Sequence, residues 1–312
     1  MSDLRLHIAS LAAVFLALGL GILVGTAFVG TPVVERQAQA MVRQQKALVQ
    51  RLDDLSGTLR READVADKNE AAMRALLPGL VAGKLDGRRV LVVRAGDYAE
   101  AAERAAEALG LAGAIVARAD LPEEAWQARF AAGGVAGANR ERIAAEARAL
   151  APLLLGEGNG TDGLKPYREE GRLVGDNLPA GARLVVLVGG KRLSPGEEPP
   201  TGRGEGPLMQ ELGAALIRAW RQASPEVTVV GVEPLEAEVS FITAYQNEGV
   251  ATVDNIDRAA GQIALPSALR GERAAYGMKP TAELVLPLSL QEPARREPDR
   301  PGAAGRLPAG AL

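Results

Sequence analysis

Residues 88–94 read RRVLVVR, and the apolar run within them predicts a strand that is buried on both faces. Gly96 and Asp97 follow this strand, and residues 98–109 then show an alanine-rich helical pattern. Strand and helix patterns alternate up to residue 269, which predicts an α/β domain with a mostly parallel, Rossmann-like sheet over residues 86–286. The other expected strands cover residues 114–118, 183–188, 227–232 and 249–253, and the other expected helices cover 121–132, 140–155, 207–222 and 258–269.

Residues 8–34 precede this domain and contain no charged side chain. Their most apolar part, residues 8–29, has about the 20 residues that a helix needs to cross the hydrocarbon core of a membrane. A cleaved signal peptide has a shorter apolar core and ends at small residues, a pattern that Gly25-Thr26-Ala27 matches poorly. We therefore expect an uncleaved transmembrane anchor over residues 1–34, with a signal peptide as the alternative.

Small residues recur at every fourth position of the expected anchor. A helix face made of small residues lets two helix backbones approach closely, so this face predicts self-association. The alternative is that alanine and glycine are simply common in this chain. The small residues are Ala9, Ala13, Ala17, Gly21 and Gly25.

The charges around the anchor do not decide its orientation. Arg5 precedes the apolar segment, whereas Arg36 and Arg43 follow it. Taken alone, the positive-inside rule would keep the rest of the chain in the cytoplasm, but long domains cross membranes largely regardless of charge. We expect a single-pass protein of the cell membrane with its head outside the cytoplasm, which the absence of cysteine fits.

Residues 35–80 carry an apolar seam in which steps of four and three residues alternate over more than six heptads. This pattern predicts a coiled-coil stalk through which two copies of the chain form a homodimer. The alternative is one long amphipathic helix that lies on its own globular domain. The seam consists of Val34, Ala38, Met41, Leu48, Leu52, Leu55, Leu59, Ala66, Met73, Leu76 and Leu80, with polar breaks at Gln45, Glu62 and Asn69.

The surroundings of the seam favour the coiled coil, because the seam is narrow and its flanks are charged. Pro78 and Gly79 are expected to end the helix, since proline removes a backbone donor and crowds the preceding turn. The charged flanks are formed by Arg43, Lys46, Arg51, Arg60 and Arg61.

The composition of the 312 residues excludes several classes of protein. The chain has no cysteine, which rules out disulfides, zinc fingers and thiol catalysis. Its one histidine, His7, leaves no base for a Ser-His-Asp triad and no multi-histidine metal site. A net charge of −3 and an aromatic content of 3% argue against nucleic-acid binding. We expect a non-enzymatic protein without a cofactor or a metal site, and a disordered tail rich in Pro, Arg and Gly over residues 287–312.

Two turns at the carboxyl ends of expected strands are candidates for a ligand or partner crevice. One holds Gly96 and Asp97, and the other holds Gly189 and Gly190 before a loop over residues 191–206. Ligands of open α/β sheets bind at this edge. Neither turn contains GxGxxG or a Walker A motif, so nucleotide binding is not supported. The alternative is that the glycines serve tight turns.

Residues 252–257 bring Asp254, Asn255 and Asp257 together. Carboxylate and amide oxygens suit a hard cation, but three groups are far from a complete coordination shell. The simpler interpretation makes Asp254 or Asp257 the N-cap of the helix that begins near Arg258.

Three features together resemble the MctB family, whose members are usually labelled copper transport or copper-transport outer-membrane proteins. They are LRLHIASLAAVFLALGLGILVGTAF at residues 4–28, the heptad stalk, and ATVDNIDRAAGQIAL followed by AAYG at residues 251–277. The most specific pieces are residues 10–18 and Thr252-Val253-Asp254-Asn255 with Gly261-Gln262. The resemblance covers residues 1 to about 280, and residues 133–207 match it least.

The resemblance implies a membrane-associated protein that acts in copper homeostasis or efflux. Some relatives, the SteB-like proteins, are linked instead to cell-envelope assembly and cell division through a partner membrane protein. The family carries no catalytic motif that transfers to numbered positions of this chain. The expected partners are therefore a second copy of the chain, membrane lipid and another envelope membrane protein.

The residues fit the copper label poorly, because Cu(I) prefers thiolate or thioether ligands and Cu(II) prefers imidazole. The five methionines are scattered along the chain, and His7 lies at the edge of the anchor. Two hypotheses follow. One is an MctB-type copper protein, and the other is a single-pass, coiled-coil scaffold whose α/β head binds an envelope protein. A membrane-tethered enzyme is the weakest alternative.

Overall fold

The computed structural model describes residues 3–28, 32–131, 136–158, 160–175, 178, 181–198 and 206–291. The chain divides into two compact units, residues 1–68 and 69–312. The boundary lies inside one long helix, so the last turns of that helix belong to the second unit, which we call the head.

The first unit contains helix α1 (Asp3–Phe28) and most of helix α2 (Pro32–Val81). Within α1, the 20 residues Leu6–Gly25 are long and apolar enough to cross a membrane, and none of them is buried in the chain. This is the one such stretch among the described residues, and it coincides with the anchor that the sequence predicts.

Helix α2 continues past Pro78 and Gly79 to Val81, so the prediction that these residues end the helix is wrong by one turn. The reason lies in the burial of the last turns. Leu77 and Val81 pack into the core of the head, and Met73 and Leu80 pack against it, so tertiary contacts hold the helix in place beyond the proline. Leu76, an expected seam residue, is 62% exposed, whereas Leu77 is 4% exposed.

The head is built on six strands that all run parallel in the order β2-β1-β3-β4-β5-β6. The five strands that the sequence predicts are present, and a sixth, which it missed, has only two residues. The mostly parallel α/β prediction is therefore correct, but the strand order differs from the 3-2-1-4-5-6 of dinucleotide-binding domains and places the switch point between β1 and β3. The strands are β1 (Arg89–Arg94), β2 (Ile115–Asp120), β3 (Leu184–Val188), β4 (Thr228–Val232), β5 (Ala251–Val253) and β6 (Ala275–Tyr276).

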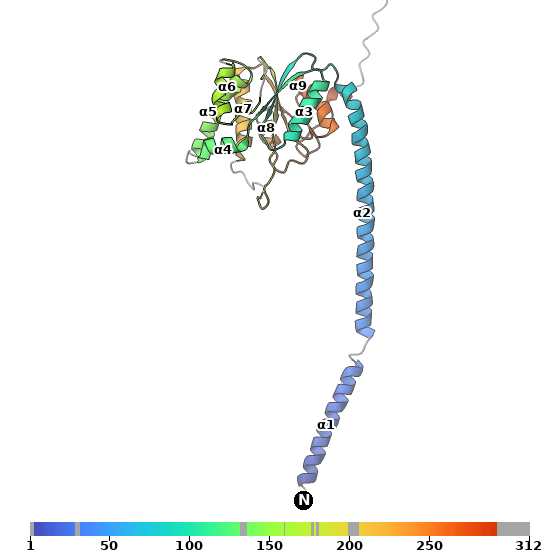
Figure 1. Cartoon of the computed structure of the whole chain (residues 1–312). Coiled ribbons are helices and arrows are strands. Elements are labelled where there is room, and N and C mark those ends of the chain that lie inside the picture. Colours follow the sequence, from blue (N-terminus) through green and yellow to red (C-terminus); the bar gives the residue numbers. More distant parts are fainter. Residues whose placement is uncertain are drawn as a thin grey trace, which may run out of the picture. The chain divides into compact units, whose positions relative to one another are not determined.

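Helices cover both faces of the sheet because neighbouring strand residues point to opposite sides and both sets are apolar (Figure 1). Val90 and Val92 face α3, α9 and the end of α2, whereas Leu91 and Val93 face the layer of α4 to α8. The helices of the head are α3 (Ala99–Leu111), α4 (Glu123–Ala131), α5 (Ala136–Leu154), α6 (Gly160–Glu169), α7 (Leu208–Ala223), α8 (Ile242–Asn247), α9 (Ala259–Leu269) and α10 (Leu288–Gln291).

Short backbone bridges protect the two edges of the sheet. Asp120 of β2 exchanges two hydrogen bonds with Val174, and Leu284 bridges Tyr276 of β6. Such caps prevent an open edge from pairing with another chain. Of the tail predicted to be disordered, residues 288–291 form the short helix α10, and residues 292–312 lie outside the described residues.

The burial of Leu77 gives a first prediction. Replacing Leu77 by Ala should lower the free energy of unfolding of the head by about 2–5 kcal/mol, because it leaves a cavity in the core. Leu76→Ala, one residue away and exposed, should change it by less than about 0.5 kcal/mol. Both variants are measured as full chains in detergent by tryptophan fluorescence, since Trp126 and Trp220 are both fully buried in the head. Equal effects of the two variants would contradict the integration of α2 into the head.

Candidate functional site

The two predicted crevice turns form one place at the switch point of the sheet. Asp97 N–H donates to the carbonyl oxygen of Gly190 over 3.0 Å, and Ala95 N–H donates to that of Val188 over 2.8 Å. A Cβ atom on Gly96 would lie 2.3 Å from the carbonyl oxygen of Gly190, closer than real contacts allow. These glycines therefore let two backbone turns touch, as the simpler interpretation of the sequence proposed.

Tyr98 covers the junction between the two turns. Its ring lies against Gly190, whose φ of +96° also requires glycine. Its hydroxyl oxygen accepts the N–H of Glu238 over 3.1 Å and lies 3.4 Å from the carbonyl oxygens of Lys191 and Glu236. Burial raises the pKa of Tyr98, so the hydroxyl stays protonated and serves as a hydrogen-bonding link between loops.

A polar hollow of about 470 Å³ opens beside this junction, and Asp97 is the only predicted crevice residue among those that line it. Three cations lie along it, and each is already paired, Arg94 with Asp120, Lys191 with Glu197, and Arg192 with Glu100. Ser194 lies in the same lining, and Glu197, the partner of Lys191, also accepts the N–H of Ser194 over 3.0 Å. Its lining consists of Arg94, Asp97, Pro122, Glu123, Glu124, Gln127, Lys191, Arg192 and Ser194.

Asp254 uses both of its carboxylate oxygens to hold the backbone that follows β6. Oδ1 accepts the N–H of Met278 over 2.8 Å and Oδ2 accepts that of Lys279 over 3.2 Å. Gly277 makes this approach possible, because a Cβ there would lie 1.8 Å from Oδ1. The side chain is buried, so its oxygens are engaged in holding the loop rather than directed to a cation.

The prediction that Asp254 or Asp257 caps the following helix is wrong. Asp257 Oδ1 accepts the N–H of Leu235 over 2.7 Å, and no side chain at the N-cap position of α9 caps that helix. The N–H of Ala259 donates instead to Glu70 Oε1 of α2 over 2.9 Å. A carboxylate at a helix N-terminus is favourable wherever it comes from, and here the end of α2 is close enough to supply it.

Asn255 is fully buried, and neither polar atom of its side chain has a hydrogen-bond partner among the described residues. It packs on the first turn of α9, where a Cβ on Gly261 would lie 2.2 Å from its carbonyl oxygen and 2.6 Å from its Oδ1. Glycine at position 261 therefore makes room for the asparagine. Among the described residues, no group of three or more His, Cys, Asp or Glu side chains is placed to hold a metal ion.

Glu233 and Lys279 form a buried ion pair that the sequence did not predict. Glu233 directly follows β4 and is fully buried. It accepts hydrogen bonds from Ser240 Oγ over 2.6 Å and from the N–H of Phe241 over 2.8 Å. An acid directly after a buried strand is a signal that the sequence did contain, whereas nothing local in it marks Lys279 as the partner. The pair joins the loop after β4 to the loop after β6.

Tyr245 fills a niche made by three glycines. Cβ atoms on Gly189 and Gly213 would each lie 2.7 Å from its hydroxyl oxygen, and one on Gly231 would lie 2.5 Å from its ring. The hydroxyl has no hydrogen-bond partner in the described part of the chain. Burial and the nearby Glu233 carboxylate raise the pKa of Tyr245, so it acts as a packing residue.

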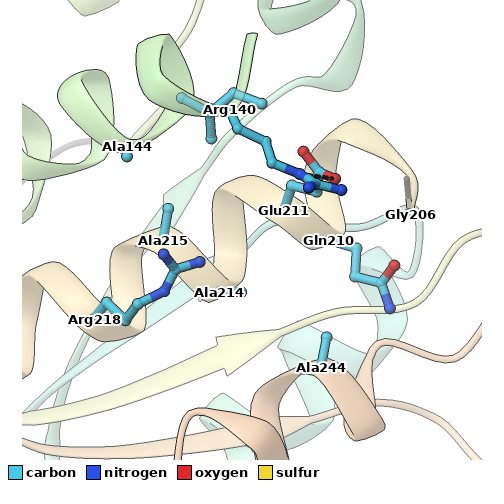
Figure 2. Close-up of a pocket in the computed structure, with 10 residues that line it drawn as sticks. Arg140, Ala144, Gly206, Gln210, Glu211, Ala214, Ala215, Arg218 and Ala244 are labelled. Atoms are coloured by element: carbon cyan, nitrogen blue, oxygen red, sulfur yellow. Dashed lines mark ion pairs between the residues drawn. The ribbon is translucent and has the colours of Figure 1, made fainter. Parts of the chain in front are cut away.

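A groove of about 250 Å³ runs between α5, α7 and α8, and the sequence gave no sign of it (Figure 2). Arg140 reaches across it and pairs with Glu211 at 3.5 Å. Arg218 also lines the groove and pairs with Glu248 at 3.1 Å. Charged side chains thus border small apolar ones along this groove. Its small side chains belong to Ala144, Ala214, Ala215 and Ala244.

The predicted oligomerisation residues are exposed in the single chain. Leu48, Leu52, Leu55 and Leu59 all lie in the exposed part of α2. A Cβ added to Gly21 or Gly25 would meet no described atom within 4 Å apart from the neighbouring backbone of its own helix. Ala13 and Ala17 of α1 are likewise exposed. The pairing of these faces with a second chain remains a prediction.

Comparison with known proteins gives one match. A family model described as "Copper transport outer membrane protein, MctB" matches residues 1–287. No curated protein and no solved structure matches the chain.

Because the two turns are in contact at Gly96, a methyl group added there is expected to reduce stability. Gly96→Ala should lower the free energy of unfolding by about 1–3 kcal/mol, because the new Cβ collides with backbone. Gly110→Ala in α3 is the matched control, since a Cβ there meets nothing within 4 Å. The control should stabilise the head by up to about 1 kcal/mol, as expected for alanine in a helix. Urea unfolding of both full chains measures the difference, and a neutral G96A variant would refute the close packing.

Replacing tyrosine by phenylalanine is expected to change stability differently at Tyr98 and at Tyr245. Tyr98→Phe should cost about 1–2 kcal/mol, because it leaves the N–H of Glu238 without its acceptor. Tyr245→Phe removes a hydroxyl that has no partner, so it should be neutral or stabilising. Thermal unfolding of both full-length variants provides the comparison, and a larger loss in Y245F than in Y98F would reverse the assignment.

Proposed function

The chain belongs to the MctB family of copper transport outer membrane proteins, and on this premise we propose that it acts in copper transport or homeostasis at the cell envelope as a non-enzymatic membrane protein. Membership rests on a match over residues 1–287, which includes α1, α2 and nearly all of the head. In this proposal copper is the transported substrate and not a cofactor of the chain.

The donor chemistry of the chain supports an indirect role in handling this cargo. The soft donors are distributed over different elements, with His7 on α1, Met41 and Met73 on α2, Met209 on α7 and Met278 after β6. Met209 is buried in the core and Met73 packs against it, so both have a structural function. Because copper sites need several soft ligands at one point, we infer that a partner or an assembly of chains supplies the copper path.

The exposed apolar face of α2 favours a second description of the same role. In it the chain is a single-pass scaffold that associates with itself through α1 and α2 and presents its head to another envelope protein, in envelope assembly or cell division. In this description, the partner binds at the polar hollow at the switch point or at the groove between α5 and α7. The polar groups inside the head hold its loops together, which fits a binding module.

We further propose that α1 is a single membrane span and that the head lies outside the cytoplasm. The 20-residue apolar stretch of α1 is the physical basis of the span. A chain without cysteine suffers no thiol oxidation in an oxidising compartment, which supports the outer location.

The copper role is tested in cells that lack this chain. We expect them to hold more copper than the parent cells after growth in copper, measured by mass spectrometry of whole-cell metal. The full chain should restore the parental level. A variant with the exposed soft donors removed, carrying His7→Asn, Met41→Leu and Met278→Leu, should restore it equally well, because these residues are not the copper ligands in this proposal.

Two results would contradict this proposal. Unchanged copper content in cells without the chain would remove the copper role. Failure of the triple variant alone, at normal protein level, would show that the chain itself holds the metal.

A further inference from the structure

The exposed part of α2 has a wider apolar face than a two-stranded coiled coil needs. In the heptad register of the seam, Met41, Leu48 and Leu55 occupy d positions and Leu52 and Leu59 occupy a positions. Valines stand beside them, Val42 and Val49 at e positions and Val65 at a g position. These valines are 51%, 50% and 55% exposed, so none of the residues that the structure describes covers them.

The charged residues of this segment lie on the opposite side of the helix. Of the nine charged residues between Met41 and Ala66, seven occupy b, c or f positions, and the exceptions are Arg51 and Glu62. Arg43, Lys46, Arg60 and Arg61 therefore point away from the seam, although the sequence analysis took them for its flanks. The face made of a, d, e and g positions is almost free of charge.

The width of a face determines how many helices cover it. In a two-stranded coiled coil the neighbour covers a and d, and e and g stay at the rim, where charged residues are usual. A face that includes apolar e positions is typical of a helix that packs against two neighbours in a bundle. With one neighbour, Val42 and Val49 would remain in water.

The other helices of the bundle are further copies of this chain. Only three residues separate α1 from α2, so copies anchored in one membrane carry their α2 helices in the same direction and at the same height. Val42 then meets the same layer in each neighbour. Arg51 is the one charged residue at the e and g positions of residues 41–65, so these positions provide no pattern of opposite charges that would select a different helix.

We propose that α2 forms a parallel bundle of three or more copies over residues 41–59. The bundle rests on the self-association through α1 and α2 proposed above, and it specifies how many chains associate. The bundle ends before the head, because Glu62 places a carboxylate at a d position, and Met73 and Leu80 already pack against the core of the head.

The test uses the full chain in lipid nanodiscs and measures its copy number by native mass spectrometry. We expect at least three copies for the natural chain. Val49→Lys places a charge at an e position and should reduce the number to two or one. Gln50→Lys is the matched control, since it adds the same charge at the neighbouring f position, and it should leave the number unchanged. Tryptophan fluorescence of each variant verifies that the head remains folded.

The outcomes separate this inference from the proposal it rests on. Two copies for the natural chain, unaffected by V49K, would overturn the bundle and leave the homodimer standing. A single copy would overturn both. Glu62→Leu provides a further measurement, because removing the carboxylate layer should lower the detergent-induced loss of oligomer, and a greater loss in this variant would contradict a parallel seam.

Discussion

The head depends on the burial of its parallel sheet on both faces. A parallel sheet exposes no face to water, so each side needs a layer of apolar helices. Among the described residues, α4 to α8 cover one side of the sheet, and α3 and α9 lie on the other. The end of α2 completes that side with Leu77 and Val81, and Glu70 of the same helix caps α9. The head therefore includes the last turns of the helix that follows α1, and removing those turns would open its core.

The sequence was most informative where the signal is local. Five strands were predictable because each is a short apolar run bounded by turn residues, and α1 because its length and lack of charge suffice. The two-residue strand β6 was not, since a strand that short has no period of its own. The heptad pattern predicted the helix α2. It did not predict that the last turns of this helix are buried in the head, because Leu76 and Leu77 are equally apolar and only the fold determines which one is buried.

The polar groups of the candidate site show more clearly that sequence patterns do not predict contacts between distant residues. The sequence indicated Asp254, Asn255 and Asp257 as a cluster, and the fold brings Asp254 to residues 278 and 279, and Asp257 to Leu235. The cap of α9 comes from a residue about 190 positions away, which no local rule finds. The glycines were easier to interpret, since a close approach of two turns is one of the few reasons for Gly96 and Gly190 to face each other.

The buried polar groups described here serve the fold of the head. Asp254 holds a loop, Glu233 pairs with Lys279, and Tyr98 links three backbone groups. Most of the large apolar side chains that the single chain leaves exposed lie along α1 and the exposed part of α2. Apolar surface of this extent gains free energy only when another surface covers it. The function proposed for this family member therefore depends on surfaces that are completed by lipid and by other protein chains, and the folded head provides one rigid component of that assembly.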